Sequence, residues 1–308
     1  MAITLNELTD EVVINLSGYT MQQDKSAHLV ADVPATASTI ASPITLSLST
    51  TENVGMGVFE IDDELIYVDT FDRISNTATV PPYGRAYLGT TLAAHTAGTK
   101  VTVSPIFPRH VVKRAINDTV RAIGATIFAV KQTTFTFNPA VTTYELDGLN
   151  IQNIIAMHWQ SIGPSKEWIR VKRYDFDANP DATTWGANAQ TVTIGDNIVA
   201  GRTVKVTYAT APEALSTTAT TSYSTQTGLP ESTRDVVILG AAYRLLTYLD
   251  PARASQVSPQ ADETDAKRPY GSSQSATKQL YALFSQRLAE ETSAQQKQYP
   301  PRVHFSSR

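Results

Sequence analysis

Helical and strand periodicity alternate along this chain, and the alternation limits its fold more than any other feature. Apolar residues recur every three or four positions from Leu5 to Leu16, a spacing that predicts a short amphipathic helix ending at Gly18. The same spacing returns after a proline and predicts a long helix from Arg109 to Lys131. Neither stripe is apolar enough for its helix to stand alone, so the helices must bury these stripes against one another.

Two more helices are expected toward the C-terminus. The first follows a capping sequence at Ser232 and stops at Pro251, and the second carries apolar residues from Ala276 to Leu288. A pair of prolines then ends the helical pattern and starts an extended tail over residues 299–308.

Two regions of strand periodicity lie between the helices. Residues 34–104 are rich in Thr, Ser, Val and Ile and predict a small β module with a hairpin at an acidic turn. Residues 132–212 contain five short alternating runs, which predict a second β module of the sandwich type. The Ser- and Thr-rich segment 213–231 is too polar to bury and is expected to be an extended loop.

This order of parts predicts an α+β fold, in which a four-helix core carries two inserted antiparallel β modules and an extended C-terminal tail. The expected parts are residues 1–20 (first core helix), 34–104 (inserted small β module), 105–131 (long core helix), 132–212 (second inserted β-sandwich module), 213–231 (Ser/Thr-rich loop), 232–298 (two C-terminal core helices) and 299–308 (tail).

Composition narrows the functional classes. The chain has 25 Lys and Arg against 29 Asp and Glu, a net charge of −4, which excludes a nucleic-acid-binding footprint over the whole chain. It has no cysteine, which excludes disulfides, thiolate zinc sites and a cysteine nucleophile. The N-terminus lacks the regions of a signal peptide, and no apolar run approaches the length of about 18 residues needed for a membrane span. We therefore expect synthesis in the cytoplasm and no association with a membrane.

The common catalytic signatures are absent. The sequence contains no P-loop, dinucleotide-binding, zinc-protease or nucleophile-elbow motif. Its five histidines are dispersed, and none lies three or four positions from another: His28, His95, His110, His158 and His304. We therefore expect no catalytic residue, no metal site and no bound cofactor.

The densest group of carboxylates, Glu60, Asp62, Asp63 and Glu64, has two interpretations. Their oxygens are ligands that a hard cation such as Ca²⁺ prefers. The alternative is a solvated hairpin turn. The turn is favoured, because the EF-hand spacing is missing and turn chemistry alone accounts for these residues.

Aromatic and basic residues of the second β module also allow two interpretations each. The aromatic group is either a sugar-stacking platform or sandwich core, and core is favoured. Its members are Trp159, Trp168, Trp185 and Tyr174. Strand alternation places Arg170 and Lys172 on one face and Arg173 on the other. This basic strip is either a contact for an acidic partner or an ordinary solvated face.

The C-terminal tail is a candidate docking segment. Its large apolar side chains are expected to be exposed, and its prolines lower the conformational entropy lost on docking. The candidate docking residues are Tyr299, Arg302, Val303, Phe305 and Arg308. A disordered terminus is the alternative.

The segment from Arg85 to Val101 resembles a motif of neck and tail proteins in the virions of tailed bacteriophages. The usual form of that motif is Arg-Gly-x-x-Gly-Thr, a run of small residues, His, and then Gly and a valine strand. Gly89 and His95 match this form, whereas Ala86 stands where the usual form has Gly.

Together with the helical frame and the tail, this motif is similar to the head-to-tail connector adaptor (neck ring protein) family. The resemblance implies a structural, non-enzymatic protein in the virion neck of a siphovirus. Such a protein forms a homo-oligomeric ring, a dodecamer, under the portal protein and joins the DNA-filled capsid to the tail or to a downstream head-closure or stopper protein. Genomic DNA passes through the lumen without sequence-specific binding, and the C-terminal segment docks onto the portal.

A second function stays open from the sequence. The chain is alternatively a tail or baseplate protein whose second β module binds host carbohydrate. An exposed cluster of tryptophans on that module would favour this alternative, whereas buried tryptophans would count against it.

Overall fold

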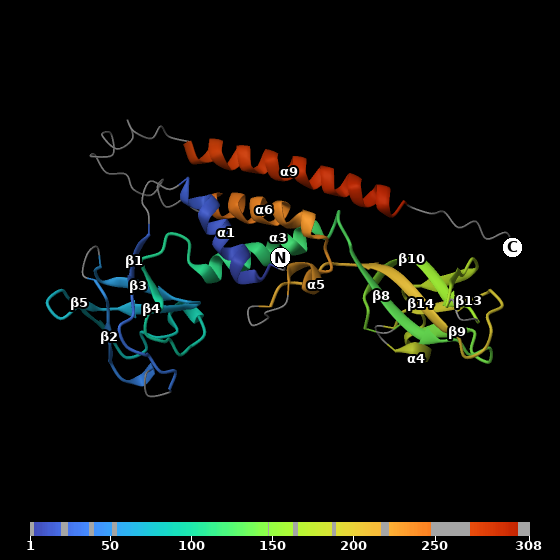
Figure 1. The fold of residues 1–308 in the computed structure, drawn as a ribbon, viewed down its shortest axis with the longest axis horizontal. Helices are drawn as coiled ribbons and strands as arrows, with labels where there is room; N and C mark the ends of the chain where they lie inside the picture. The colour runs from blue at the N-terminus through green and yellow to red at the C-terminus, as the bar shows by residue number, and fades with distance from the viewer. Residues whose placement is uncertain are drawn as a thin grey trace. The chain divides into compact units, whose positions relative to one another are not determined.

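The computed structural model describes most of the chain and has a mixed α/β fold with several antiparallel sheets (Figure 1). The described residues are 3–19, 24–36, 40–50, 54–146, 148–162, 166–186, 189–216, 222–247 and 272–300. The chain divides into two compact units, and each is described by itself. The network unit comprises Asn6–Ile116 and Gly240–Leu280; the sandwich unit comprises Met1–Leu5, Asn117–Leu239 and Tyr281–Arg308.

Four helices of more than two turns occur among the described residues, in the regions that the periodicity predicts. They are α1 (Leu5–Ser17), α3 (Arg109–Ile123), α6 (Arg234–Thr247) and α9 (Ser272–Gln298). The short helices are α4 (Ala182–Trp185), α5 (Tyr223–Thr227) and the 3-10 turns η1 (Tyr87–Gly89) and η2 (Glu231–Thr233). The stripe of α1 is fully buried at Leu8, Val12 and Leu16, which is the reason for its periodicity. The stop that the sequence predicts for the third long helix, at Pro251, lies outside the described residues.

The helix predicted from Arg109 to Lys131 is eight residues too long. It ends at Ile123, because Gly124 follows and lies so close to Pro212 that a Cβ there would be 2.7 Å from the proline Cδ. The chain then enters a strand at Ala129. Ile123 and Ile127, four residues apart, continue the helical period across this break. Ile127 is buried in the loop before the strand rather than in a helix.

The first β module consists of two antiparallel sheets. Their strand orders are β1-β7-β3-β4 and β2-β6-β5. The strands are β1 (Lys25–His28), β2 (Ile44–Ser47), β3 (Gly57–Ile61), β4 (Glu64–Val68), β5 (Thr70–Asp72), β6 (Thr77–Val80) and β7 (Lys100–Val103). The predicted hairpin is confirmed, since β3 pairs with β4 around Asp62 and Asp63. The module begins before residue 34, because β1 pairs along the whole of β7.

The second β module packs two antiparallel sheets around one apolar core. Their strand orders are β11-β10-β14-β8 and β12-β13-β9. The strands are β8 (Ala129–Thr136), β9 (Thr143–Glu145), β10 (Ile151–Gln160), β11 (Trp168–Arg170), β12 (Tyr174–Asp177), β13 (Thr191–Ile194) and β14 (Thr203–Thr210). Met157 and Val206 from the first sheet and Val192 from the second are completely buried in that core. The predicted run from Trp168 to Tyr174 is divided between the two sheets, and β9 was not predicted.

Part of the segment 213–231 is buried, although its composition is polar. Tyr223 and Thr227 of α5 are completely buried, and the Tyr223 hydroxyl lies 2.8 Å from the Thr233 hydroxyl. The Tyr223 backbone N–H donates to the Ile3 carbonyl at 2.6 Å. The expectation of an extended loop that is too polar to bury is therefore wrong for residues 222–231, because neighbouring hydroxyl groups satisfy each other.

Candidate functional site

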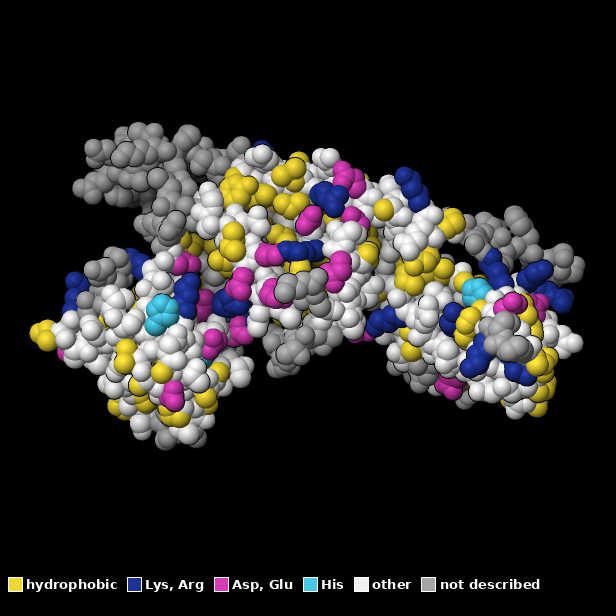
Figure 2. Space-filling view, viewed as in Figure 1, with side chains coloured by type: hydrophobic (Ala, Val, Ile, Leu, Met, Phe, Trp, Pro, Cys, Tyr) yellow, Lys and Arg dark blue, Asp and Glu magenta, His cyan; other side chains and the backbone are white. Residues whose placement is uncertain are grey.

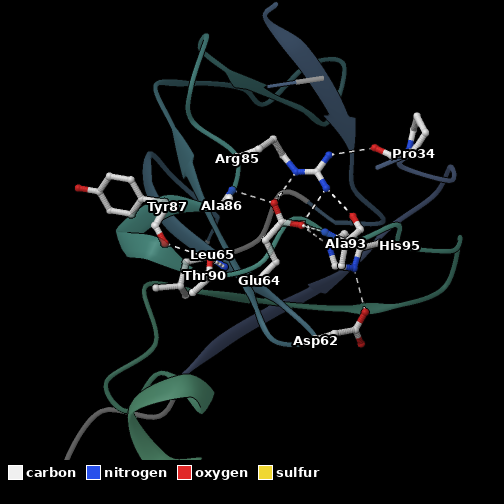
Figure 3. A network of polar contacts seen from close by, with 10 residues as sticks. All are labelled: Pro34, Asp62, Glu64, Leu65, Arg85, Ala86, Tyr87, Thr90, Ala93 and His95. Carbon is white, nitrogen blue, oxygen red and sulfur yellow. Dashed lines mark hydrogen bonds and ion pairs between the residues drawn. The ribbon is translucent and has the colours of Figure 1, made fainter. Parts of the chain in front are cut away.

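A buried carboxylate, that of Glu64 at the start of β4, is the centre of a polar network in the first β module (Figure 3). Arg85 donates to both of its oxygens, from Nε at 2.7 Å and from Nη2 at 2.8 Å. The backbone N–H groups of Ala86 and Ala93 donate to the same two oxygens at 2.9 Å and 3.0 Å, and His95 Nε2 lies 3.0 Å from Oε2. The side chains of Glu64, Arg85 and His95 are 0% exposed. The carboxylate is therefore fully hydrogen-bonded in place of its water shell.

The two side-chain partners of Glu64, Arg85 and His95, have further anchors. Arg85 Nη2 also donates to the Ala93 carbonyl at 2.6 Å, and Arg85 Nη1 donates to the Pro34 carbonyl at 3.3 Å. His95 Nδ1 lies 2.9 Å from Asp62 Oδ2. These contacts join Pro34, loop 85–95 and the hairpin that carries Asp62 and Glu64.

The electrostatics of the network favour its ionised form. Burial would raise the pKa of Glu64, but hydrogen bonds from Arg85, His95 and the two backbone amides outweigh burial and bring that pKa to about 2. Burial would likewise lower the pKa of His95, but its hydrogen bonds to Glu64 and Asp62 raise that pKa above its usual range. Glu64 therefore stays charged at all pH values well above 2.

The network explains the spacing of the motif that begins at Arg85. Arg85 and His95 lie at the two ends of one loop, and both bind the same carboxylate. Ala86, between them, has φ 51° and ψ 37°, a left-handed conformation that glycine adopts without cost. The motif is thus a loop closed on a buried acid. Sequence reasoning found the motif and assigned Glu64 to a solvated turn, but it did not connect the two, because Glu64 lies 21 and 31 positions away from Arg85 and His95.

The site is closed, which limits its chemistry. Glu64 and Arg85 have no exposed side-chain surface, so a substrate has no access to either charge. Among the residues that the structure describes, no group of three or more His, Asp or Glu side chains is arranged to hold a metal ion. We interpret the network as the element that sets the shape of loop 85–95.

The interpretation of the acidic group as one solvated turn is half right. Asp62 and Asp63 form the turn, and their side chains are 60% and 47% exposed. Glu60 and Glu64 are buried in the flanking strands instead. Glu60 pairs with Leu65, and Glu64 pairs with Ile61, so the two acids point to opposite faces of the hairpin. Both faces are buried at this point, which the run of acidic residues concealed.

Glu60 connects the first β module to helix α3. Its Oε1 accepts the backbone N–H of Arg109, the first residue of that helix, at 2.5 Å. The neighbouring Asp63 accepts from Lys113 Nζ at 2.6 Å, and the Arg109 guanidinium pairs with Asp10 of α1. Burial raises the pKa of Glu60 to about 7, although the Arg109 backbone and charge lower it in part. The hairpin thus caps the helix with a buried acid whose charged form is disfavoured by burial.

The second half of α9 is fixed to the start of β8 within the sandwich unit. The Gln295 side chain accepts the Phe128 backbone N–H at 3.1 Å and donates to the Phe128 carbonyl at 2.7 Å. Ser232 donates to Glu291 at 2.7 Å. A cavity of about 290 Å³ lies beside these contacts, and Tyr299 is one of the residues that line it. Gln295 had no signal in the sequence, since glutamine on a polar helix usually faces water.

The structure describes only the first of the five candidate docking residues. Tyr299 is half-buried, with its ring centroid 6.2 Å from that of Phe128 and its backbone N–H bonded to the Gln295 carbonyl. The expectation that Tyr299 is exposed is therefore wrong, because the helix brings it back onto the sandwich unit. Arg302, Val303, Phe305 and Arg308 lie outside the described residues.

The aromatic residues of the second β module do not share one surface. Trp159 and Tyr174 pack against the core, as predicted, and Trp185 is half-buried. Trp168 is 40% exposed, and Lys205 Nζ lies 4.4 Å from the centre of its ring. The β10–β11 register pairs Trp159 with Ile169, so Trp159 and Trp168 point to opposite faces of the sheet.

The basic strip is shorter than predicted. Strand β11 ends at Arg170, Val171 is completely buried, and Lys172 and Arg173 follow outside the strand. Arg173 Nε lies 3.3 Å from Asp196 Oδ1, and the Lys172 backbone N–H donates to the same carboxylate at 2.5 Å. The alternation expected across residues 170–173 therefore does not hold, because the chain crosses there from one sheet to the other.

None of the described helices is long and apolar enough to cross a bilayer. The polar composition of the longest one, α9, accounts for this result, since charged and amide side chains occur along its length.

A family model described as SU10 adaptor protein matches residues 90–304, more than two thirds of the chain. This is a phage adaptor family, which indicates a structural, virion-associated phage protein that works with other virion proteins, and such families are typically non-enzymatic. The matched region includes the end of the loop motif, three of the four long helices and the whole second β module. No curated protein matches the chain.

Proposed function

Because the chain belongs to the SU10 adaptor protein family, we propose that it is the head-to-tail connector adaptor of a phage neck. In this role it forms a ring, a dodecamer, under the portal protein and joins the DNA-filled capsid to the tail or to a head-closure or stopper protein. Genomic DNA passes through the lumen without sequence-specific binding. The match over residues 90–304 is the observation that carries this proposal.

The four long helices are the proposed ring-building core. The matched region contains α3, α6 and α9, and α1 adds a stripe that is buried at every predicted position. In this proposal the β modules are insertions that the helices present to other virion proteins. The closed network at Glu64 supports a non-enzymatic role, since its charges serve the loop and have no exposed surface.

The C-terminal tail is the proposed portal-docking segment. Tyr299 lies against Phe128, so the base of the tail is fixed on the sandwich unit. From there Arg302, Val303, Phe305 and Arg308 are the residues proposed to contact the portal, with Tyr299 at the base of the contact. Burying one aromatic side chain in a partner pocket is worth about 1.5–3 kcal/mol, and repetition around a ring multiplies the effect.

Complementation of a phage that lacks this protein tests the whole proposal. Particles made without the protein are expected to be DNA-filled heads without tails, and electron microscopy of complemented particles should show a ring of this protein beneath the portal. Tailed particles formed in its absence would refute the connector role.

A truncation tests the docking role separately. A chain ending at Pro300 keeps Tyr299 and its contact with Phe128, so its melting temperature should match that of the full chain. The same truncated chain should fail to join heads to tails. Ser232→Ala is the matched control, because it breaks the hydrogen bond to Glu291 in the same unit and leaves all five docking residues in place. Normal yields of infectious particles from the truncated chain would contradict docking by the tail.

A further inference from the structure

The two sheets of the second β module differ in charge. The strands of the four-stranded sheet, β8, β10, β11 and β14, contain three cations and no Asp or Glu: Lys131, Arg170 and Lys205. The strands of the three-stranded sheet, β9, β12 and β13, contain three carboxylates and no Lys or Arg: Glu145, Asp175 and Asp177. The positive and negative side chains of the strands are thus separated between the two sheets, although both sheets pack on one core.

Strand register collects most of the cations on one surface. His158 of β10 pairs with Arg170 on one side and with Lys205 on the other, so the three form a row across the sheet. The neighbours of this row along the strands, Met157 and Val206, are completely buried, so the row points away from the core. Trp168 lies next to the row, with Lys205 over its ring. We call Trp168, Arg170, His158 and Lys205 the basic face. Figure 2 shows Lys and Arg side chains gathered over this module.

The carboxylates collect on the outward side of the other sheet. Asp175 and Asp177 are exposed and alternate with half-buried Tyr174 and Phe176, which pack on the core. The register brings Glu145 into the same row as Asp177, with Thr191 between them. We call Glu145, Asp175 and Asp177 the acidic face. The side chains of both rows point outward from the shared core, each from its own sheet, so one copy of the module cannot bring its two faces together.

We propose that the basic face of one copy of this chain binds the acidic face of a second copy, so that the second β modules associate head to tail. The charge complementarity of the two faces carries this inference. A contact of this kind uses different surfaces on the two partners, and it forms a closed ring where the rotation between copies allows closure. This inference depends on the proposed function in one respect, which is that the partner is a second copy of the chain.

The chemistry of the faces sets the strength of the contact. Charge pairs at an exposed surface are weak and are screened by salt, so the contact weakens as ionic strength rises. Trp168 provides the large apolar side chain that such interfaces use as an anchor. The purified protein therefore associates weakly at high concentration and low salt, and copies held side by side by the rest of the particle associate more strongly.

Charge reversal with a mixed rescue tests the contact. One variant carries Arg170→Glu and Lys205→Glu, and the other carries Asp175→Lys and Asp177→Lys. Sedimentation velocity at low salt should show concentration-dependent association of the wild type, and each variant alone should associate at least about tenfold more weakly. An equimolar mixture of the two variants should associate again, because each variant retains the face that the other needs.

A matched control and a competing ligand sharpen the outcome. Arg73→Glu with Lys100→Glu makes the same change in net charge at exposed positions of the first β module and should leave self-association unchanged. A wild type that stays monomeric at every concentration, or a mixture that does not recover, overturns the proposal. If association is unaffected while the R170E/K205E variant loses binding to a labelled single-stranded oligonucleotide, the basic face binds nucleic acid instead and the proposal is wrong. These assays use purified protein, so their failure is distinct from a failure to complement the phage.

Discussion

Both β modules of this protein have an apolar core, but among the described residues only the first also encloses charged side chains. The first encloses a charged network in which Glu64 receives hydrogen bonds from Arg85, His95 and two backbone amides. The second encloses a core of apolar side chains from both of its sheets and keeps its charges on the outside. A buried network specifies one loop geometry but depends on every partner, whereas an apolar core tolerates changes of surface charge and is sensitive to lost volume. Both modules should therefore be sensitive to lost core volume, and the first should in addition depend on its buried charges.

The largest effect is expected from removing one partner of the buried pair. Arg85→Ala leaves the Glu64 carboxylate buried beside an empty space, and such a change costs about 3–5 kcal/mol of the free energy of unfolding. Chemical denaturation gives the loss, and hydrogen exchange should localise it to the first β module. The control is Arg173→Ala, which breaks an ion pair at an arginine that is 79% exposed and should cost less than about 1 kcal/mol. Equal losses from the two changes would remove the distinction between buried and exposed charge.

Removing side-chain volume from the core of the second module should also lower the free energy of unfolding. Met157→Ala removes a completely buried side chain from its core, and changes of this kind cost about 2–5 kcal/mol. Met56→Ala is the control, because Met56 is 69% exposed in the first module and should lose almost nothing. Hydrogen exchange should show faster exchange in β10 and β14 for Met157→Ala alone. Exchange that rises equally in both modules would mean that they do not unfold separately.

The first module should also depend on pH in two opposite directions. The pKa of Glu60 is raised to about 7 in the fold, so its favourable contribution is complete below pH 4.5 and is lost as pH rises toward 7. The pKa of Glu64 is lowered to about 2, so its contribution is complete above pH 4.5 and is lost as pH falls toward 2. The raised pKa of His95 adds to the loss at rising pH.

Two isosteric variants separate these contributions. Glu60→Gln keeps an oxygen for the Arg109 backbone N–H but removes the buried charge, so it should stabilise the protein by about 1–3 kcal/mol at pH 8 and by nothing at pH 4. Glu64→Gln should destabilise it at pH 8, because Arg85 then lacks a charged partner. Denaturation curves at the two pH values measure both effects. A Glu60→Gln variant that is less stable than the wild type at pH 8 would show that the Glu60 charge is useful in the fold.

Sequence patterns predicted the parts of this protein that depend on neighbours along the chain. The stripe of α1 and the hairpin at Asp62 and Asp63 follow from local spacing, and both are confirmed. Features that depend on distant residues were not predicted. The acidic run looked uniform, yet Glu64 is buried because Arg85 and His95 reach it from another loop.

The same reasoning applies to helix ends and helix faces. The period of α3 continued past Gly124, and only the close approach of Pro212 shows why the helix stops. Gln295 has the composition of a solvated helix position, but it bonds both backbone groups of Phe128 from 167 residues away. A pattern of polarity cannot distinguish an amide that faces water from one that pairs with a distant backbone.

The smallest predicted effect concerns Ala86, which stands where the loop motif usually has glycine. Ala86 has φ 51°, a left-handed conformation that is unfavourable for any residue with a Cβ by about 1–2 kcal/mol. Its backbone N–H must keep this orientation to reach Glu64 Oε1, so the network holds the strain in place. Ala86→Gly relieves the strain but adds freedom to the unfolded chain, so the net gain should be at most about 1 kcal/mol. Ala93→Gly is the matched control, because Ala93 donates to the other oxygen of Glu64 without a positive φ, and this change should lower stability by about 0.5–1 kcal/mol. Thermal melting of the two variants at pH 7 measures the difference in sign. If both variants lose stability equally, loop 85–95 does not hold Ala86 in the left-handed region, and the match between the motif's glycine and the buried acid would need another explanation.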